Sequence, residues 1–237
     1  MPITRRDYFK PIQIGGCVLW LDGADSSTIT GTSPVTQWRD KSTSACSVFS
    51  SGGSPTYTRT AALSLGCVSF NGSTDYLTIG NFTDLQPNTM FIIATLNSLS
   101  TNASYAFIAQ SDDSGYPADG LGAAFFYYAS GGTPYLMPWA GITGATTNPP
   151  LYFSAGATYI YSVLFNGASS GVGYNGNFTS GVNPGTVGWK NLRLGANWPL
   201  NAFQSINVAE VIFYSSALST TQRQQVEAYL AQKWSLT

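Results

Sequence analysis

Short apolar runs, rich in β-branched and aromatic residues, recur along almost the whole chain, with glycine, proline, asparagine and serine between them. Runs of this length, bounded by turn residues, are typical of β-strands. Regular short strands with turn signals between them favour a β-sandwich over a parallel α/β fold. We expect strands near residues 17–22, 35–38, 67–70, 76–79, 89–97, 105–110, 122–129, 134–137, 158–165, 171–176, 191–195 and 206–214.

A helix is expected at the C-terminal end, over residues 219–234. Ser219 and Gln222 have the spacing of a capping box, in which each side chain accepts a hydrogen bond from the backbone N–H of the other residue. The polar side of this segment is not basic, which argues against an interfacial membrane helix. Apolar side chains recur at helical spacing and predict a face that packs on the sandwich: Val226, Tyr229, Leu230 and Trp234.

The chain is expected to form one domain preceded by a short arm. Its 237 residues fit a single large β domain, which we place at residues 17–237. Residues 1–16 carry Arg5, Arg6 and Lys10, a basic cluster that is typical of a solvated tail or of an arm that docks in an assembly. The segment after Met1 is polar and no apolar run approaches ~20 residues, so we expect neither a signal peptide nor a membrane span.

Charged residues make up 9% of the chain and the net charge is −1. A chain with so little positive charge gives no electrostatic case for binding nucleic acid. A surface dominated by hydroxyls and amides repels its neighbours weakly and tolerates close packing in an assembly. No cofactor is expected, and calcium is the ion that the loops suggest.

Histidine is absent, which excludes catalysis by Ser-His-Asp or Cys-His groups. A glycoside hydrolase needs two carboxylates across one bond. The chain has two glutamates: Glu227 falls in the expected helix, and Glu210 has no acidic residue two positions away in its strand. We therefore expect no catalytic residues.

Two blocks of sequence resemble a known family. Val18-Leu-Trp-Leu-Asp-Gly-Ala-Asp-Ser-Ser-Thr-Ile29 is followed by residues 37–42 and 67–77, and a second block comprises 192–195 and 208–219 with the helix behind it. Together they resemble concanavalin A-like, laminin G-like jelly-roll domains, which occur in bacterial surface proteins, phage tail and fibre proteins and virion proteins of large DNA viruses. The resemblance implies two curved antiparallel sheets but no single function.

Loop carboxylates form two candidate calcium sites, because calcium takes six to eight oxygen ligands and members of the family often use loop aspartates and asparagines. The first site comprises Asp112, Asp113 and Asp119, and the second Asn71 and Asp75. The alternative is that these residues form turns and cap loop amides.

Aromatic residues in loop-rich sequence are candidates for a carbohydrate platform. They are Tyr116, Tyr135, Trp139 and Trp198. The alternative is that they pack in the core or against another protein. By contrast, tryptophans in patterned elements are expected in the core: Trp20, Trp38 and Trp234.

In the first block, three aspartates match the family pattern: Asp22, Asp25 and Asp40. We expect them to accept hydrogen bonds from loop amides and to pair with Arg39 or Lys41, with a bound ion as the alternative.

The three cysteines are widely spaced and form no metal-binding pattern. Cys17, Cys46 and Cys67 are expected as buried thiols, with a disulfide between Cys17 and Cys67 as the alternative if their strands are neighbours.

These observations favour a non-catalytic structural or assembly protein, a virion surface or minor capsid component whose partners are other protein chains. The alternative is a lectin-like attachment module that binds glycans, and a glycoside hydrolase is less favoured. The expected location is a virion or a cell surface.

Overall fold

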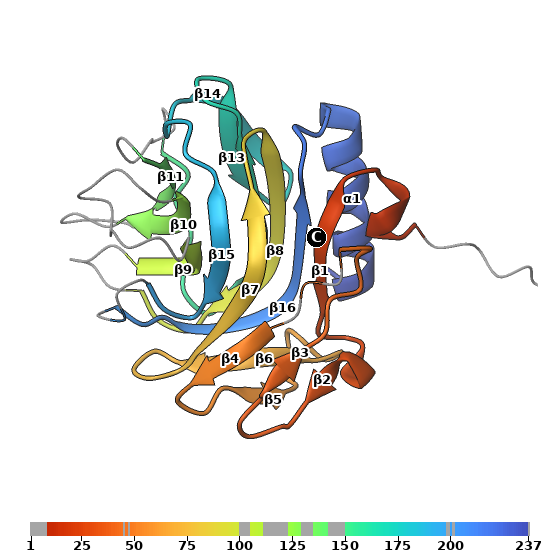
Figure 1. The fold of residues 1–237 in the computed structure, drawn as a ribbon, viewed down its shortest axis with the longest axis vertical. Helices are drawn as coiled ribbons and strands as arrows, with labels where there is room; N and C mark the ends of the chain where they lie inside the picture. The colour runs from red at the N-terminus through yellow and green to blue at the C-terminus, as the bar shows by residue number, and fades with distance from the viewer. Residues whose placement is uncertain are drawn as a thin grey trace, which may run out of the picture.

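Two antiparallel sheets pack face to face in the computed structural model, and one α-helix covers the outer face of the larger sheet (Figure 1). The structure describes residues 9–44, 46, 48–99, 105–110, 123–128, 135–141, 150–197, 200 and 202–236. The expected antiparallel sandwich with a C-terminal helix is confirmed. None of the helices in these ranges is long and apolar enough to cross a membrane.

The larger sheet has eight strands. Its order is β14 (Asn177–Val182), β13 (Ser170–Tyr174), β12 (Thr158–Phe165), β8 (Asn88–Leu96), β16 (Ser205–Tyr214), β6 (Cys67–Asn71) and β5 (Thr56–Thr58), with β1 (Cys17–Asp22) also paired to β16. Strand β16 pairs with β6 through residues 205–208 and with β1 through residues 210–214. The strands β1 and β6 therefore follow one another along the same side of β16.

The smaller sheet has six strands, in the order β11 (Tyr135–Ala140), β10 (Ala123–Tyr128), β9 (Tyr105–Gln110), β15 (Trp189–Leu194), β7 (Tyr76–Asp84) and β4 (Val48–Gly52). The short strands β2 (Ile29–Thr30) and β3 (Gln37–Trp38) pair with each other, and two 3-10 turns, η1 (Pro11–Gln13) and η2 (Ser26–Thr28), precede them. The helix is α1 (Thr220–Trp234).

Four strands were not expected from the sequence: β2, β4, β5 and β14. These short strands are rich in serine, threonine and glycine, so they carry little apolar alternation, and backbone pairing with a neighbour defines them. The link from β13 to β14 does carry a signal: Asn175 and Gly176 have φ values of 47° and 78°. Two positive φ values in an Asn-Gly pair are characteristic of the tight hairpin turn that joins these strands.

The larger sheet contributes to two hydrophobic cores. Its inner face and the smaller sheet form the sandwich core, and its outer face packs against α1 and η1. Because both faces of β8 are covered, all nine of its residues are buried. Trp38 lies in the sandwich core, and Trp20 and Trp234 lie in the core under the helix, so the expectation for these three tryptophans is confirmed.

The helix begins as the sequence predicts. The Ser219 hydroxyl accepts a hydrogen bond from the Gln222 backbone N–H at 3.3 Å, and the Gln222 side chain accepts one from the Ser219 N–H at 3.0 Å. The expected packing face is also confirmed, because Val226, Leu230 and Trp234 are buried under the helix and Tyr229 packs beside them.

All three cysteines are free. Cys17 pairs in register with Tyr214, whereas the neighbour of Cys67, Val68, pairs with Val208 at the other end of β16. The two strands are thus in line rather than side by side, and the disulfide considered between Cys17 and Cys67 does not form. Burial raises the pKa of both thiols to about 12, which keeps them protonated and unreactive.

Candidate functional site

Strand β11, at one edge of the smaller sheet, separates its side chains onto two faces. Leu136 and Ala140 point into the sandwich core. Met137 belongs to a separate apolar cluster, against which Tyr135 and Trp139 pack. Because side chains alternate along a strand, these last three residues share the outward face of the sheet.

A second segment extends this outward face. Tyr152 forms an antiparallel bridge with Tyr135, and their rings meet edge to face with centroids 6.4 Å apart. Its neighbours Leu151 and Phe153 are buried in the sandwich core, so the Tyr152 side chain points outward and is 51% exposed. The Tyr174 hydroxyl donates to the Tyr152 carbonyl at 2.7 Å and holds the segment in place.

We call Tyr135, Trp139 and Tyr152 the aromatic row. Tyr135 and Trp139 are four residues apart on one strand, a separation of about 13 Å along the sheet. Met137, which is 8% exposed, lies between them, and Ala124 of β10 lies beside Trp139 as its cross-strand partner. The aromatic row therefore packs against small and apolar side chains of the paired strands β10 and β11.

The strands and the segment that carry the aromatic row have no charged residues. The sequence contains no aspartate, glutamate, lysine or arginine in β10, in β11 or in residues 150–153. Aromatic faces combine a large apolar surface with a polarised π-system, and so attract the weakly polar C–H faces of uncharged ligands. The arrangement suits a neutral ligand that has both apolar faces and hydroxyls.

The structure brings together two of the four aromatic residues predicted as a platform, Tyr135 and Trp139, on one face. The other two, Tyr116 and Trp198, lie outside the described residues. Tyr152 was missed by the sequence analysis. Its signal was its position between two apolar residues in Leu-Tyr-Phe, which is the alternation of a short strand.

The candidate calcium site at Asn71 and Asp75 is occupied by internal hydrogen bonds. The two Asp75 oxygens accept from the backbone N–H groups of Ser54 (2.8 Å) and Asn71 (3.1 Å). The Asn71 side-chain oxygen accepts from the N–H groups of Ser73 (2.8 Å) and Thr74 (2.9 Å). These bonds are those of the alternative role, in which the residues cap loop amides.

Among the residues that the structure describes, no group of three or more acidic or cysteine side chains is arranged to hold a metal ion. The other predicted calcium residues, Asp112, Asp113 and Asp119, lie outside this part of the chain, as do Arg5 and Arg6 of the arm. Lys10 is exposed before η1, where its backbone N–H donates to the Gln13 side chain at 2.7 Å.

The three aspartates of the first block bind loop amides and a lysine, as expected. Asp40 accepts from the backbone N–H groups of Trp20, Ser42 and Cys46. Asp22 and Asp25 both pair with Lys41, at 2.8 and 2.9 Å. Arg39 does not join them and instead donates to the Ser27 carbonyl.

Glu210 has an acidic neighbour that the sequence analysis missed. Asp22 of β1 lies opposite Glu210 in the strand register. Glu210 is fully buried, and desolvation raises the pKa of its carboxyl, although the nearby Lys233 opposes this shift. Its oxygens accept hydrogen bonds from the indoles of Trp20 and Trp234, so the Glu210 carboxylate is not open to a glycan.

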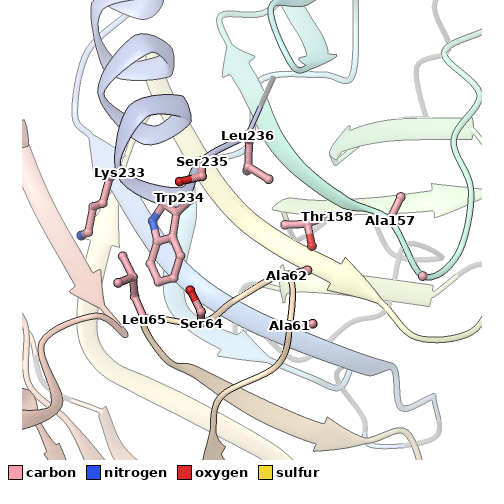
Figure 2. A pocket seen from close by; sticks show the side chains of 11 residues that line it. Ala61, Ala62, Ser64, Leu65, Ala157, Thr158, Lys233, Trp234, Ser235 and Leu236 are labelled. Atoms are coloured by element: carbon pink, nitrogen blue, oxygen red, sulfur yellow. The ribbon is translucent and has the colours of Figure 1, made fainter.

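A hollow of about 460 Å³ opens beside the end of α1 (Figure 2). It is lined mainly by small side chains, and Figure 2 shows Trp234 pointing from the helix toward the loop that carries Ala62 and Ser64. Trp234 is 4% exposed, so it presents little aromatic face to the hollow. We therefore place the candidate site on the aromatic row and not here.

No protein-family model matches the chain, and no curated protein matches it. Solved structures do share its fold. A Trypanosoma rangeli sialidase in complex with sialic acid is 12% identical, with a TM-score of 0.60 over 94% of this chain and 34% of the sialidase. This chain thus spans about a third of that enzyme's length.

Two smaller neighbours are similar as well. Domain 4 of a GH43 extracellular arabinanase from Geobacillus stearothermophilus, in complex with arabinotriose, is 13% identical, with a TM-score of 0.59 over 81% of this chain and 97% of that domain. The receptor-binding domain of a botulinum neurotoxin C/D mosaic serotype is 13% identical. The TM-score is 0.56, over 90% of this chain and 51% of that chain.

At these identities the likeness shows the fold, a β-sandwich of jelly-roll type, which agrees with that part of the family resemblance. None of these three neighbours is named as a virion protein or a laminin G domain, so that part of the resemblance stays a prediction.

Proposed function

We propose that this chain is a non-catalytic carbohydrate-binding module and that the aromatic row is its binding face. The observation that carries the proposal is the alignment of Tyr135, Trp139 and Tyr152 on one outward face of the smaller sheet, in segments that have no charged residues. One neighbour in fold, the arabinanase domain, was solved in complex with a neutral oligosaccharide, arabinotriose. This favours the lectin-like alternative of the sequence analysis.

Glycan binding is tested by substitution in the aromatic row. A glycan array that includes arabinotriose and sialic acid identifies a bound oligosaccharide, whose affinity is then measured by calorimetry. Trp139→Ala and Tyr152→Ala are each expected to weaken binding at least tenfold, which is about 1.4 kcal/mol, because a buried aromatic contact carries much of the energy of an interface.

Leu85→Ala is the matched control. Leu85 is an apolar side chain that is 75% exposed and lies outside the aromatic row, so its loss is expected to leave the affinity unchanged. Binding that is unaffected by both aromatic substitutions, or an array with no bound glycan, would contradict the proposal.

The assembly function remains a second proposal, supported by the low charge of the chain and the basic residues of its arm. Particle size distinguishes it. If the purified chain associates through the arm, Arg5→Ala with Arg6→Ala is expected to reduce the mass measured by light scattering. A monomeric wild-type chain would argue against self-assembly.

A further inference from the structure

Strands β1 and β16 and helix α1 lie next to one another (Figure 1). Three charged side chains meet between them: Asp22, Glu210 and Lys233. The Lys233 ammonium lies 2.6 Å from Asp22 Oδ1 and 2.8 Å from Glu210 Oε2. The side chains of Lys233, Asp22 and Glu210 are 17%, 6% and 0% exposed. The lysine nitrogen and a carboxyl are thus held in contact in a largely buried site, with a second carboxyl touching the same nitrogen.

Aromatic rings form the walls of this site. The Lys233 nitrogen lies 6.0, 5.4 and 5.5 Å from the ring centroids of Trp20, Tyr229 and Trp234. The indoles of both tryptophans donate to Glu210 at 2.7 Å, and the Tyr229 hydroxyl does so at 2.9 Å. The rings bury Glu210 and fix its carboxylate beside the lysine, while Asp22 and Lys233 line the inner wall of a hollow of about 520 Å³.

The Asp22 carboxyl is held by donors on both oxygens. Besides Lys233, Oδ1 accepts from the Ala24 backbone N–H at 3.1 Å, and Oδ2 accepts from Lys41 at 2.8 Å. Donors placed in this way stabilise negative charge that develops on a carboxyl when a nucleophile attacks its carbon.

We propose that Lys233 and Asp22 condense into an amide bond, with Glu210 acting as the general base. One proton passes from the lysine ammonium to the Asp22 carboxylate, which leaves a neutral amine and a neutral acid. The amine nitrogen attacks Asp22 Cγ, and Glu210 takes the proton that the nitrogen gives up. Glu210 then returns this proton to the departing hydroxyl, so that one water leaves and the C–O bond is replaced by a C–N bond.

The physical setting favours this reaction in three ways. Well-oriented reactants within one molecule reach effective molarities on the order of 10⁵ M or more, which lowers the barrier for groups that the fold already holds together. Buried ions are costly to desolvate, and the amide replaces one buried cation and one buried anion with a neutral group. The raised pKa of Glu210, caused first by its burial, makes it a better proton acceptor than an exposed carboxylate.

The bond would join the last turn of α1 to the end of β1. It would close a covalent ring through most of the chain, from residue 22 to residue 233. A cross-link that closes so long a loop restricts the unfolded chain strongly. It would also attach the helix to the sheet under conditions that separate non-covalent layers.

Mass spectrometry of the purified, folded full-length chain tests the bond. The wild-type chain is expected to lose about 18 Da, the mass of one water, relative to its sequence. Trypsin is expected to release a branched peptide that joins residues 7–39 to residues 224–237, since a modified Lys233 is not cleaved. A folded chain that keeps its full mass after prolonged incubation overturns the proposal.

Three variants locate the chemistry. Lys233→Arg keeps the charge but lacks the reactive amine, and it is expected to abolish the branched peptide, as is Asp22→Ala. Glu210→Gln is expected to slow or stop its formation. Lys190→Arg is the matched control, because Lys190 is an exposed residue of β15 in the smaller sheet and takes no part in this site; it is expected to keep the bond. A branched peptide that runs through Lys41 contradicts the assignment.

Discussion

At the scale of single residues, Asp84 at the end of β7 has a carboxyl group in surroundings that disfavour its ionised form. Its Oδ2 atom is buried and has no hydrogen-bond partner among the described residues. Desolvation raises the pKa of Asp84 to about 6, against an ordinary value of 3.8. The folded chain therefore holds this proton more tightly than the unfolded chain does.

The Asp84 carboxyl makes stability depend on pH. Because its pKa is raised in the folded state, its contribution is most favourable below about pH 4 and is lost as the pH rises through about 6. Asp84→Asn is expected to raise the Tm above pH 6 and to change it little near pH 4. Thermal unfolding of both proteins from pH 4 to pH 8 measures this, and parallel Tm profiles would show that Asp84 does not titrate in this way.

The loop aspartates show why the contacts of a residue can be predicted only in part from the sequence. Asp22, Asp25 and Asp40 lie near one another in the chain, so their use of loop amides and Lys41 follows from local spacing. The contact of Asp22 with Lys233 depends on a helix at the other end of the chain. No local pattern in the sequence predicts this contact.

At the scale of elements, α1 is the segment that the sequence describes most completely. Its capping box and its apolar spacing are local properties, and both appear as expected. The helix also binds the sheet edge: Arg223 pairs with Glu227 at 2.8 Å and stacks over the Phe178 ring of β14 at 4.0 Å.

Loss of the helix cap is expected to have a measurable effect. Ser219→Ala removes the acceptor for the Gln222 N–H and is expected to lower the free energy of unfolding by about 1 kcal/mol. Urea denaturation measures the change. Gln224→Ala, at an exposed position inside the helix, is the control and is expected to be neutral or slightly stabilising. Equal effects of the two substitutions would mean that the cap contributes nothing specific.

At the scale of the whole molecule, β8 and β16 connect the two cores. Residues of both strands alternate between the sandwich core and the core under α1. For example, Val211 and Phe213 face the smaller sheet, whereas Ile212 and Tyr214 face the helix side. Neither core can be lost without disturbing the strands that support the other.

This arrangement predicts a single unfolding transition. Far-ultraviolet circular dichroism, which includes the helix, and tryptophan fluorescence, which reports both cores, are expected to give coincident curves in urea. Val226→Ala, which leaves a cavity under the helix, is expected to cost about 2–4 kcal/mol by analogy with other core truncations and to shift both curves together. A helix signal that disappears first would show that the layers unfold separately.

The sequence by itself determined the sandwich class, most strands, the capped helix and the aromatic alternation of β11, because these depend on residues that are close along the chain. Only the tertiary structure decided that Tyr152 joins Tyr135, that Cys17 and Cys67 are in line, and that Asp22, Glu210 and Lys233 meet. The physical reason is strand register and helix docking. Both arise from burying apolar faces of segments far apart in the sequence, and a one-residue shift in register would turn every such side chain to the opposite face.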